Sequence, residues 1–265
     1  GVQTSIYNAL RSSQSSSPYY NKSTDAYCYI GTEKPNHDVV IVGWDDSYSK
    51  DNFNTDLEGD GAFICQNSWG DNFGENGFFY ISYYDTNIGT HNVVYTDIEN
   101  TDNYDHIYQS DLCGWVGQLG YNKDSIYGAN VFTAEGNETL KAASFYATGK
   151  DSQYELYVVR QFEDETSLEK MIPVASGKLG NAGYYTVDFN QGIEVDAGER
   201  YAVVLYIITP GSVHPMAIEY AADEATENVD LDDGESYISA NGSKWVSVDT
   251  VEKSNLCIKA FSDNR

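Results

Sequence analysis

The sequence of 265 residues predicts a mainly β protein with two domains. We expect the first to be a short helix followed by a small β-barrel, and the second to be an antiparallel β-sandwich of the jelly-roll type. Short runs of β-branched and aromatic residues, bounded by Gly, Asn and Asp, recur along the chain. In the second half of the chain no helix-length segment separates these runs, which favours a sandwich. The length suffices for two hydrophobic cores.

The first domain begins with the predicted helix. Ile6, Ala9 and Leu10 have helical spacing within residues 4–11, and a serine-rich run ending at Pro18 would terminate the helix. The later apolar runs predict strands that form one barrel-like sheet. These strands are residues 39–42, 62–66, 78–83 and 91–95.

A polar segment separates the two domains. Residues 99–106 lack apolar periodicity, which predicts a linker between a domain at residues 1–100 and a domain at residues 105–265. Beyond the linker, alternating apolar residues and intervening turn clusters predict the strands of the sandwich. These strands are residues 140–148, 154–159, 184–189, 201–208, 216–220, 244–248 and 256–261.

The composition excludes several partners. Lys and Arg total 15 against 41 Asp and Glu, for a net charge of −26, which would repel nucleic acid and anionic membrane surfaces. No apolar run reaches the roughly 18 to 20 residues of a membrane span. The acidic residues are spread along the chain, so the two interpretations are an ordinary solvated surface and carboxylates available to calcium.

The four cysteines do not form a recognisable metal motif. Cys28, Cys65, Cys113 and Cys257 show neither Cys-x-x-Cys spacing nor neighbouring His clusters, which argues against a zinc site. Two alternatives stay open: a disulfide such as Cys113 to Cys257, and free thiols.

Two short segments contain the residues of an acyl-transfer site. Residues 36–44 read Asn-His-Asp-Val-Val-Ile-Val-Gly-Trp, and residues 66–70 read Gln-Asn-Ser-Trp-Gly. A histidine that moves a proton needs a third group to fix its orientation, and an asparagine oxygen can accept the proton on one ring nitrogen. Taken separately, each segment also fits a structural histidine or an ordinary turn.

Together, and in this order, the two segments resemble the histidine and asparagine segments of papain-type (C1 family) cysteine peptidases. The resemblance covers about residues 2–98, the right-hand half of that fold. It implies that His37 and Asn67 are catalytic and that Trp69 shields their hydrogen bond from water. The family places its cysteine roughly 130 to 150 residues before the histidine, whereas 36 residues precede His37 here. We therefore expect the nucleophile on a separate Cys-bearing half, across an apolar half-interface.

Two features depart from the family pattern. Asp38 occupies a position where related sequences usually carry a small residue, beside the pocket for the substrate side chain two before the scissile bond. An aspartate at this position would favour a basic substrate side chain in the pocket, or would mark a site whose function is no longer maintained. The acidic insertion at residues 45–61 contains spaced carboxylates, but its twelfth loop position is Asn67 rather than the Glu of a calcium loop, so we expect an ordered acidic loop.

The second domain resembles the lectin-like domain that follows papain-type domains in bacterial cell-surface peptidases. The segments that carry this resemblance are residues 127–133, 138–146 and 154–158. Trp115 and Trp245 are candidates for stacking on sugars, with ordinary core positions as the alternative. The candidate calcium ligands, for which a solvated acidic turn is the alternative, are Asp105, Asp111, Asp232 and Asp233.

These observations predict the C-terminal part of a secreted or cell-surface bacterial cysteine endopeptidase. It would be inactive alone and would require no cofactor, with calcium as an option in the lectin-like domain. Its expected partners are the Cys-bearing half, a peptide substrate and cell-wall or surface carbohydrate. The alternative is a non-catalytic binding or adhesion protein that retains a relic peptidase half-domain.

Overall fold

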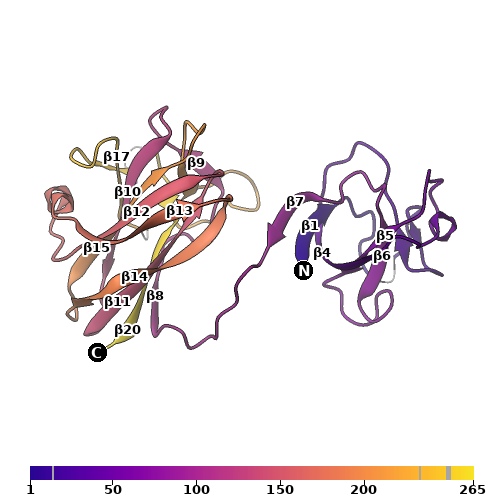
Figure 1. Cartoon of the computed structure of the whole chain (residues 1–265), viewed down its shortest axis with the longest axis horizontal. Helices are drawn as coiled ribbons and strands as arrows, with labels where there is room; N and C mark the ends of the chain where they lie inside the picture. The colour runs from indigo at the N-terminus through magenta and orange to yellow at the C-terminus, as the bar shows by residue number, and fades with distance from the viewer. Residues whose placement is uncertain (14, 233, 249–251) are drawn as a thin grey trace. The chain divides into compact units, whose positions relative to one another are not determined.

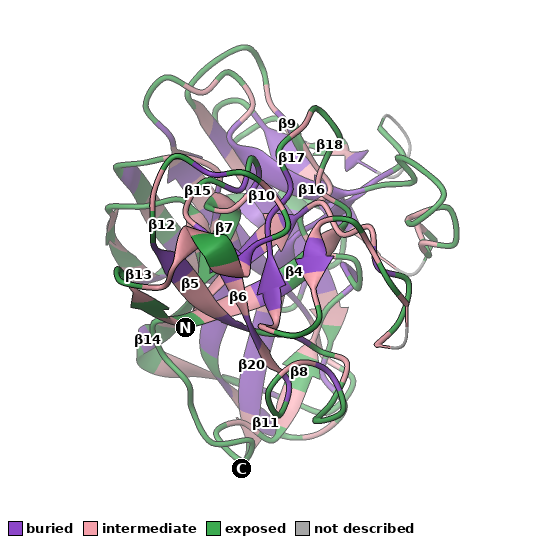
Figure 2. Ribbon diagram, turned by 90° about the vertical axis from the view of Figure 1, so that its right-hand side faces the viewer, coloured by how far each residue is buried: buried purple, intermediate pink, exposed green. Residues whose placement is uncertain are grey.

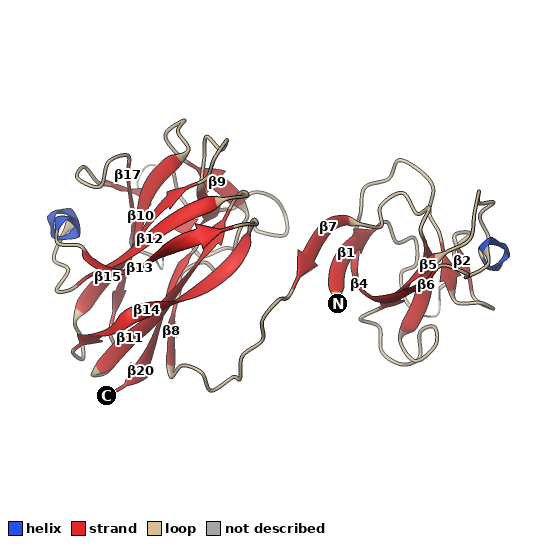
Figure 3. Cartoon of the chain, in the orientation of Figure 1, coloured by secondary structure: helices blue, strands red, loops and turns tan. Residues whose placement is uncertain are grey.

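The computed structural model describes residues 1–13, 15–232, 234–248 and 252–265, and these are mainly strands and loops (Figures 1 and 3). The predicted mainly β fold is confirmed. The chain divides into two compact units, Gly1–Glu99 and Asn100–Arg265. Two short 3-10 helices are present, η1 (Lys50–Asn52) and η2 (Glu165–Glu169).

The first unit is built on a seven-stranded sheet with the order β2-β3-β6-β5-β4-β1-β7. Its strands are β1 (Val2–Ile6), β2 (Tyr20–Asn21), β3 (Ala26–Tyr27), β4 (His37–Asp45), β5 (Ala62–Gln66), β6 (Phe78–Ser82) and β7 (Thr90–Val94). β3 and β6 pair in parallel, and the other pairs are antiparallel. One face buries a core that includes Ile6, Tyr27, Val39, Cys65, Phe79 and Ile81.

The predicted helix at residues 4–11 is wrong. Its first part is strand β1, which pairs with β4 on one side and β7 on the other. Thr4 and Ile6 are buried and alternate with less buried neighbours, a period of two that a helix would not produce. Leu10 is also buried, but it lies in the loop after the strand. Hydrogen bonding of β1 to a strand on each side outweighs the weak local preference for a helix.

The second unit contains three sheets. Their strand orders are β13-β12-β15-β10-β17-β18, β14-β11-β20-β8 and β19-β16-β9. The strands of the first sheet are β10 (Ser125–Thr133), β12 (Ser152–Val159), β13 (Ile172–Leu179), β15 (Arg200–Ile208), β17 (Ser236–Ser239) and β18 (Val246–Ser247). Those of the other two are β8 (His106–Tyr108), β9 (Gly117–Leu119), β11 (Glu138–Ala147), β14 (Gly183–Val195), β16 (Met216–Glu219), β19 (Asn255–Leu256) and β20 (Ile258–Asn264).

A large core joins these sheets. Buried side chains from several sheets pack together, among them Leu140, Phe145, Leu156, Leu205, Met216 and Ile258. In Figure 2 buried residues run along strands such as β20, whereas the loops are mostly exposed. All four cysteines are free thiols, so the disulfide alternative is not formed in this structure.

Candidate active site

Strand pairing brings His37 and Asn67 together. His37 is the first residue of β4, and Asn67 follows the last residue of β5. The two strands are antiparallel, with Val40 opposite Gln66, so the start of one strand meets the end of the other. His37 Nε2 lies 2.9 Å from Asn67 Oδ1. Residues 30 positions apart in sequence thus form one hydrogen bond at the adjoining ends of two central strands.

The asparagine fixes which nitrogen of the imidazole carries a proton. Asn67 is 7% exposed, and its Oδ1 also accepts a hydrogen bond of 2.8 Å from the Ser68 backbone N–H. Because this oxygen only accepts, Nε2 of His37 must be the donor. Nδ1 is then free to exchange a proton with a reacting group, as a general base requires.

The indole of Trp69 packs against the imidazole of this pair. The rings of Trp69 and His37 have centroids 5.3 Å apart, and Trp69 packs edge-on against Phe73 at 5.2 Å. Trp69 also packs against the core of the first unit, which holds the indole in place. An apolar cover lowers the local dielectric and strengthens the bond beneath it.

The turn after Trp69 depends on glycine. Gly70 and Gly74 have φ angles of +75° and +56°, a region that side-chain-bearing residues rarely adopt. A Cβ on Gly74 would lie 2.1 Å from the Phe78 carbonyl oxygen. The turn that leads from the asparagine segment into β6 therefore requires glycine at this position.

Asp38 lies on the opposite side of β4 from the buried Val39. Its Oδ1 accepts a hydrogen bond of 2.7 Å from Ser5 Oγ, and its Oδ2 accepts one of 3.2 Å from Gln3 Nε2. Both donors are neutral, and Asp38 forms no ion pair within the part of the chain that the structure describes. Its carboxylate is thus oriented but not neutralised.

A pocket of about 340 Å³ opens beside the imidazole, and we call it the histidine pocket. It is lined by residues 7–11, Asn36, His37 and Trp69. Arg11 and Asn36 are not predicted from the sequence to belong to the site. The signal for Asn36 was its position directly before His37, and nothing local distinguished Arg11.

The four cysteines of the chain are unsuited to act as the nucleophile. Burial raises the pKa of both Cys28 and Cys65 to about 12, with a further contribution from Asp85. Burial also raises the pKa of Cys257. Cys113 is exposed, and local desolvation beside the Glu219 carboxylate raises its pKa. A catalytic thiol needs the opposite shift, toward the thiolate.

The predicted calcium ligands do not converge. Asp105 accepts hydrogen bonds from Asn264, and Asp111 is buried with its Oδ2 3.3 Å from Lys259 Nζ. Asp232 is exposed in a bend, and Asp233 lies outside the described residues. Among the described residues, no group of three or more His, Cys, Asp or Glu could hold a metal ion. Calcium stays a prediction.

A buried cluster of oxygen atoms lies elsewhere in the second unit. Asn255 Nδ2 faces the Ser110 carbonyl at 2.8 Å, the Asp230 carbonyl at 2.8 Å and Glu219 Oε1 at 3.1 Å. An amide nitrogen has two hydrogens for these three acceptors. Glu219 and Asn255 are both fully buried. The sequence analysis missed this cluster because its members come from four separate segments.

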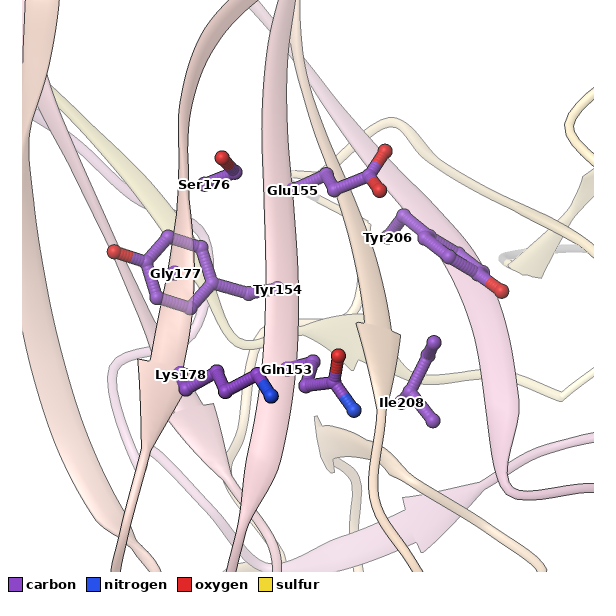
Figure 4. Close-up of a pocket in the computed structure, with 8 residues that line it drawn as sticks. All are labelled: Gln153, Tyr154, Glu155, Ser176, Gly177, Lys178, Tyr206 and Ile208. Carbon is purple, nitrogen blue, oxygen red and sulfur yellow. The ribbon is translucent and has the colours of Figure 1, made fainter.

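A second pocket, of about 270 Å³, lies on the six-stranded sheet, and we call it the sheet pocket (Figure 4). Its lining comes from three adjacent strands: Gln153, Tyr154 and Glu155 of β12, Ser176, Gly177 and Lys178 of β13, and Tyr206 and Ile208 of β15. The two candidate tryptophans lie elsewhere. Trp115 packs on Tyr146, and Trp245 packs against Tyr127 and a small core cluster.

Comparison with known families agrees with this architecture. Residues 107–262 match the family described as the lectin like domain, and residues 3–98 match the papain family cysteine proteases. The chain therefore belongs to the lectin-like domain family, and its first unit is the C-terminal half of a C1-type peptidase domain. The resemblance predicted from the two sequence segments is confirmed.

Two solved structures of the clostridial cysteine protease Cwp84 are similar to the whole chain. One, of the protein after propeptide cleavage, is 28% identical with a TM-score of 0.82, and the match covers 100% of this chain and 65% of that one. The other contains the cysteine protease and lectin-like domains of Cwp84, a surface layer associated protein of Clostridium difficile. It is 26% identical with a TM-score of 0.79, covering 100% and 58%. This chain thus spans less than two thirds of either relative.

Neither a curated relative nor, in the part of the chain that the structure describes, a membrane-spanning helix is found. A search of curated proteins found no match. Within the described residues, no helix has the length and apolar character needed to cross a membrane.

Proposed function

We propose that this chain supplies the histidine and asparagine of a papain-type cysteine endopeptidase at the bacterial cell surface. The observation that carries the proposal is the 2.9 Å contact between His37 Nε2 and Asn67 Oδ1 beneath Trp69. With Nε2 held by Asn67, Nδ1 would take the proton of a cysteine thiol and later give it to the leaving amine. A Cys-bearing half would supply that thiol.

An exposed apolar sheet face supports a partner half. Alternation along β4 puts Val42 on the same side as Asp38, away from the core, and it is 48% exposed. A β-bulge then shifts the register, so that Trp44 pairs with Phe63 and is 69% exposed beyond the bulge. Val93 of β7 and the following Tyr95 are 45% and 68% exposed, and Tyr95 donates a hydrogen bond to Gln3, which pairs with Val40. Contiguous exposed apolar side chains of this kind mark interaction surfaces.

A surface location is supported by the likeness to Cwp84, which is described as a surface layer associated protein. The proposed substrate is a polypeptide, because papain-type chemistry cleaves the amide bond through a thioester. No metal or organic cofactor takes part in these proton transfers.

The first test is reconstitution with a Cys-bearing half, supplied in one longer polypeptide or as a second chain. We expect no peptide hydrolysis by this chain alone and hydrolysis by the reconstituted protein. His37→Ala should lower kcat/KM by roughly 10²- to 10⁴-fold, the contribution of a general acid–base. Asn67→Ala should cost less, because the imidazole remains but loses its fixed orientation.

The exposed His91→Ala is the matched control and should retain activity. Full activity of the His37→Ala protein would show that this histidine is not the base. Lack of hydrolysis by the reconstituted wild-type protein would favour the alternative, a binding or adhesion protein with a relic half-domain.

Asp38 is proposed to select a basic side chain two residues before the scissile bond. The carboxylate is exposed, held by two neutral donors and unpaired with any cation among the described residues. A peptide library should show a preference for Lys or Arg at that position. Asp38→Asn should reduce the preference about fivefold, the upper value for an exposed ion pair. Equal cleavage of basic and neutral peptides by the wild-type protein would exclude this role.

We also propose that the second unit binds carbohydrate in the sheet pocket. Figure 4 shows the Tyr206 ring beside Glu155 and Gln153, with Lys178 on the neighbouring strand. A tyrosine face can pack against the C–H face of a sugar, while carboxylate, amide and ammonium groups bind its hydroxyls. This combination of a ring with both donors and acceptors favours a polyhydroxylated ligand.

Binding to isolated cell-wall polysaccharide and to an oligosaccharide array tests this second function. Tyr206→Ala should weaken binding about tenfold, or ~1.4 kcal/mol, because the stacking surface is lost. Tyr121→Ala is the control, since Tyr121 is an exposed tyrosine of the same unit that lies outside the pocket. Binding that is equally strong in the Tyr206→Ala protein would place the sugar elsewhere.

Calcium is proposed at the buried oxygen cluster rather than at the four predicted aspartates. With the amide of Asn255 reversed, its oxygen would join the Glu219 carboxylate and the Ser110 and Asp230 carbonyls, a donor set that suits calcium.

Thermal unfolding with calcium and with a chelator tests this location. Calcium at a hundredfold excess over Kd should stabilise the second unit by about 2.7 kcal/mol, and Glu219→Gln should abolish most of this gain. The exposed Glu227→Gln is the control. An identical melting temperature with calcium and with chelator would remove calcium from this cluster.

A further inference from the structure

We propose that Arg11 binds a carboxylate on the leaving-group side of the substrate, so that the enzyme favours an acidic residue directly after the scissile bond. This inference rests on the proposed peptidase function. It adds a specificity residue that acts on the opposite part of the substrate from Asp38.

Among the arginines of this chain, Arg11 differs in its ion pairing. Arg160, Arg200 and Arg265 each form ion pairs with carboxylates. Arg11 forms none within the described residues, although the chain carries 41 acidic residues against 15 basic ones. An arginine that stays unpaired in so acidic a protein is available to a carboxylate from outside.

The histidine pocket gives this guanidinium a defined neighbourhood. The other lining residues are neutral aromatic, amide and aliphatic residues together with His37, and none of them is a carboxylate. Among the described residues that line the pocket, Arg11 therefore carries the only permanent charge. Its field acts on whatever group enters beside the imidazole.

Hydrogen bonds fix the wall that carries Arg11. Asn36 Oδ1 accepts from the Asn8 backbone N–H at 2.7 Å, and Asn36 Nδ2 donates to the Asn8 carbonyl at 3.2 Å. The backbone N–H groups of Arg11 and Ser12 both donate to Ser15 Oγ, at 2.9 and 3.2 Å. The wall is thus tied to the residue directly before His37, and the fold sets where the backbone of Arg11 lies relative to the imidazole.

The chemistry places the leaving group in this pocket. When the thiolate attacks the carbonyl carbon, the C–N bond breaks and the imidazolium proton passes from Nδ1 to the leaving nitrogen. The leaving residue must therefore lie within reach of the imidazole. The pocket that His37 and Trp69 line is the space beside that ring. An acidic side chain on the leaving residue would meet Arg11 there.

Acyl transfer in the reconstituted enzyme probes this subsite directly. The thioester formed from a peptide methyl ester is offered aspartic acid amide or asparagine amide, which enter where the leaving amine departed. We expect capture by aspartic acid amide to be favoured about fivefold, the upper value for a partly exposed ion pair. Arg11→Gln should remove this preference, and Arg11→Glu should shift it toward lysine amide. Lys22→Gln, an exposed change of equal charge in the same unit, is the control.

A binding measurement separates this inference from the peptidase proposal. In this chain alone, NMR titration with aspartic acid amide should shift the Trp69 indole resonance, and Arg11→Gln should reduce that shift. Equal capture of the two amides by the wild-type enzyme, or an acidic preference that survives Arg11→Gln, would overturn the inference. Failure of the peptidase proposal appears differently, as no ester hydrolysis under any condition, and it would remove the leaving-group role even if the titration succeeds.

Discussion

The antiparallel pairing of β4 with β5 is the constraint on which the first unit depends. Val40 lies opposite Gln66, and this register alone brings the start of one strand beside the end of the other. A slip of one residue would turn His37 to the opposite face and expose Val39, which is buried in the core. The burial that stabilises the sheet and the hydrogen bond between His37 and Asn67 are therefore specified by the same register.

The sequence predicted those parts of the fold that have strong local signals. Val39–Val42 and Phe78–Tyr83 are apolar runs with turn residues at both ends, and both form central strands. β1 was mistaken for a helix because Ile6, Ala9 and Leu10 happen to have helical spacing, whereas the partners that define this strand lie far along the chain on β4 and β7. β13 was missed because it contains a proline and a glycine, which an edge strand tolerates.

The residues of the site likewise fall into those that the sequence predicts and those that it does not. Two short segments identified His37, Asn67 and Trp69, because the chemistry requires those residue types in that order. Arg11 and the Asn255 cluster gave no such local signal. Asn255 meets its buried oxygen neighbours only in the folded chain. Arg11 is notable only because folding places it beside His37 with no ion-pair partner among the described residues. The predicted aspartates illustrate the converse. They were chosen as acidic residues in loops, but Asp105 and Asp111 are already engaged by Asn264 and Lys259.

In the proposed active site, the residues around the imidazole are preorganised within the first unit. Asn67 is held by the backbone at Ser68, Trp69 by the core, and Asn36 by Asn8, and all of these contacts lie within the first unit. The imidazole therefore needs no second half to acquire its tautomer or its cover. The unit instead leaves an apolar sheet face around Val42 and Val93 exposed to water. Covering that face would release the free energy for assembly, so binding of a partner half can add the thiol without also having to order the base.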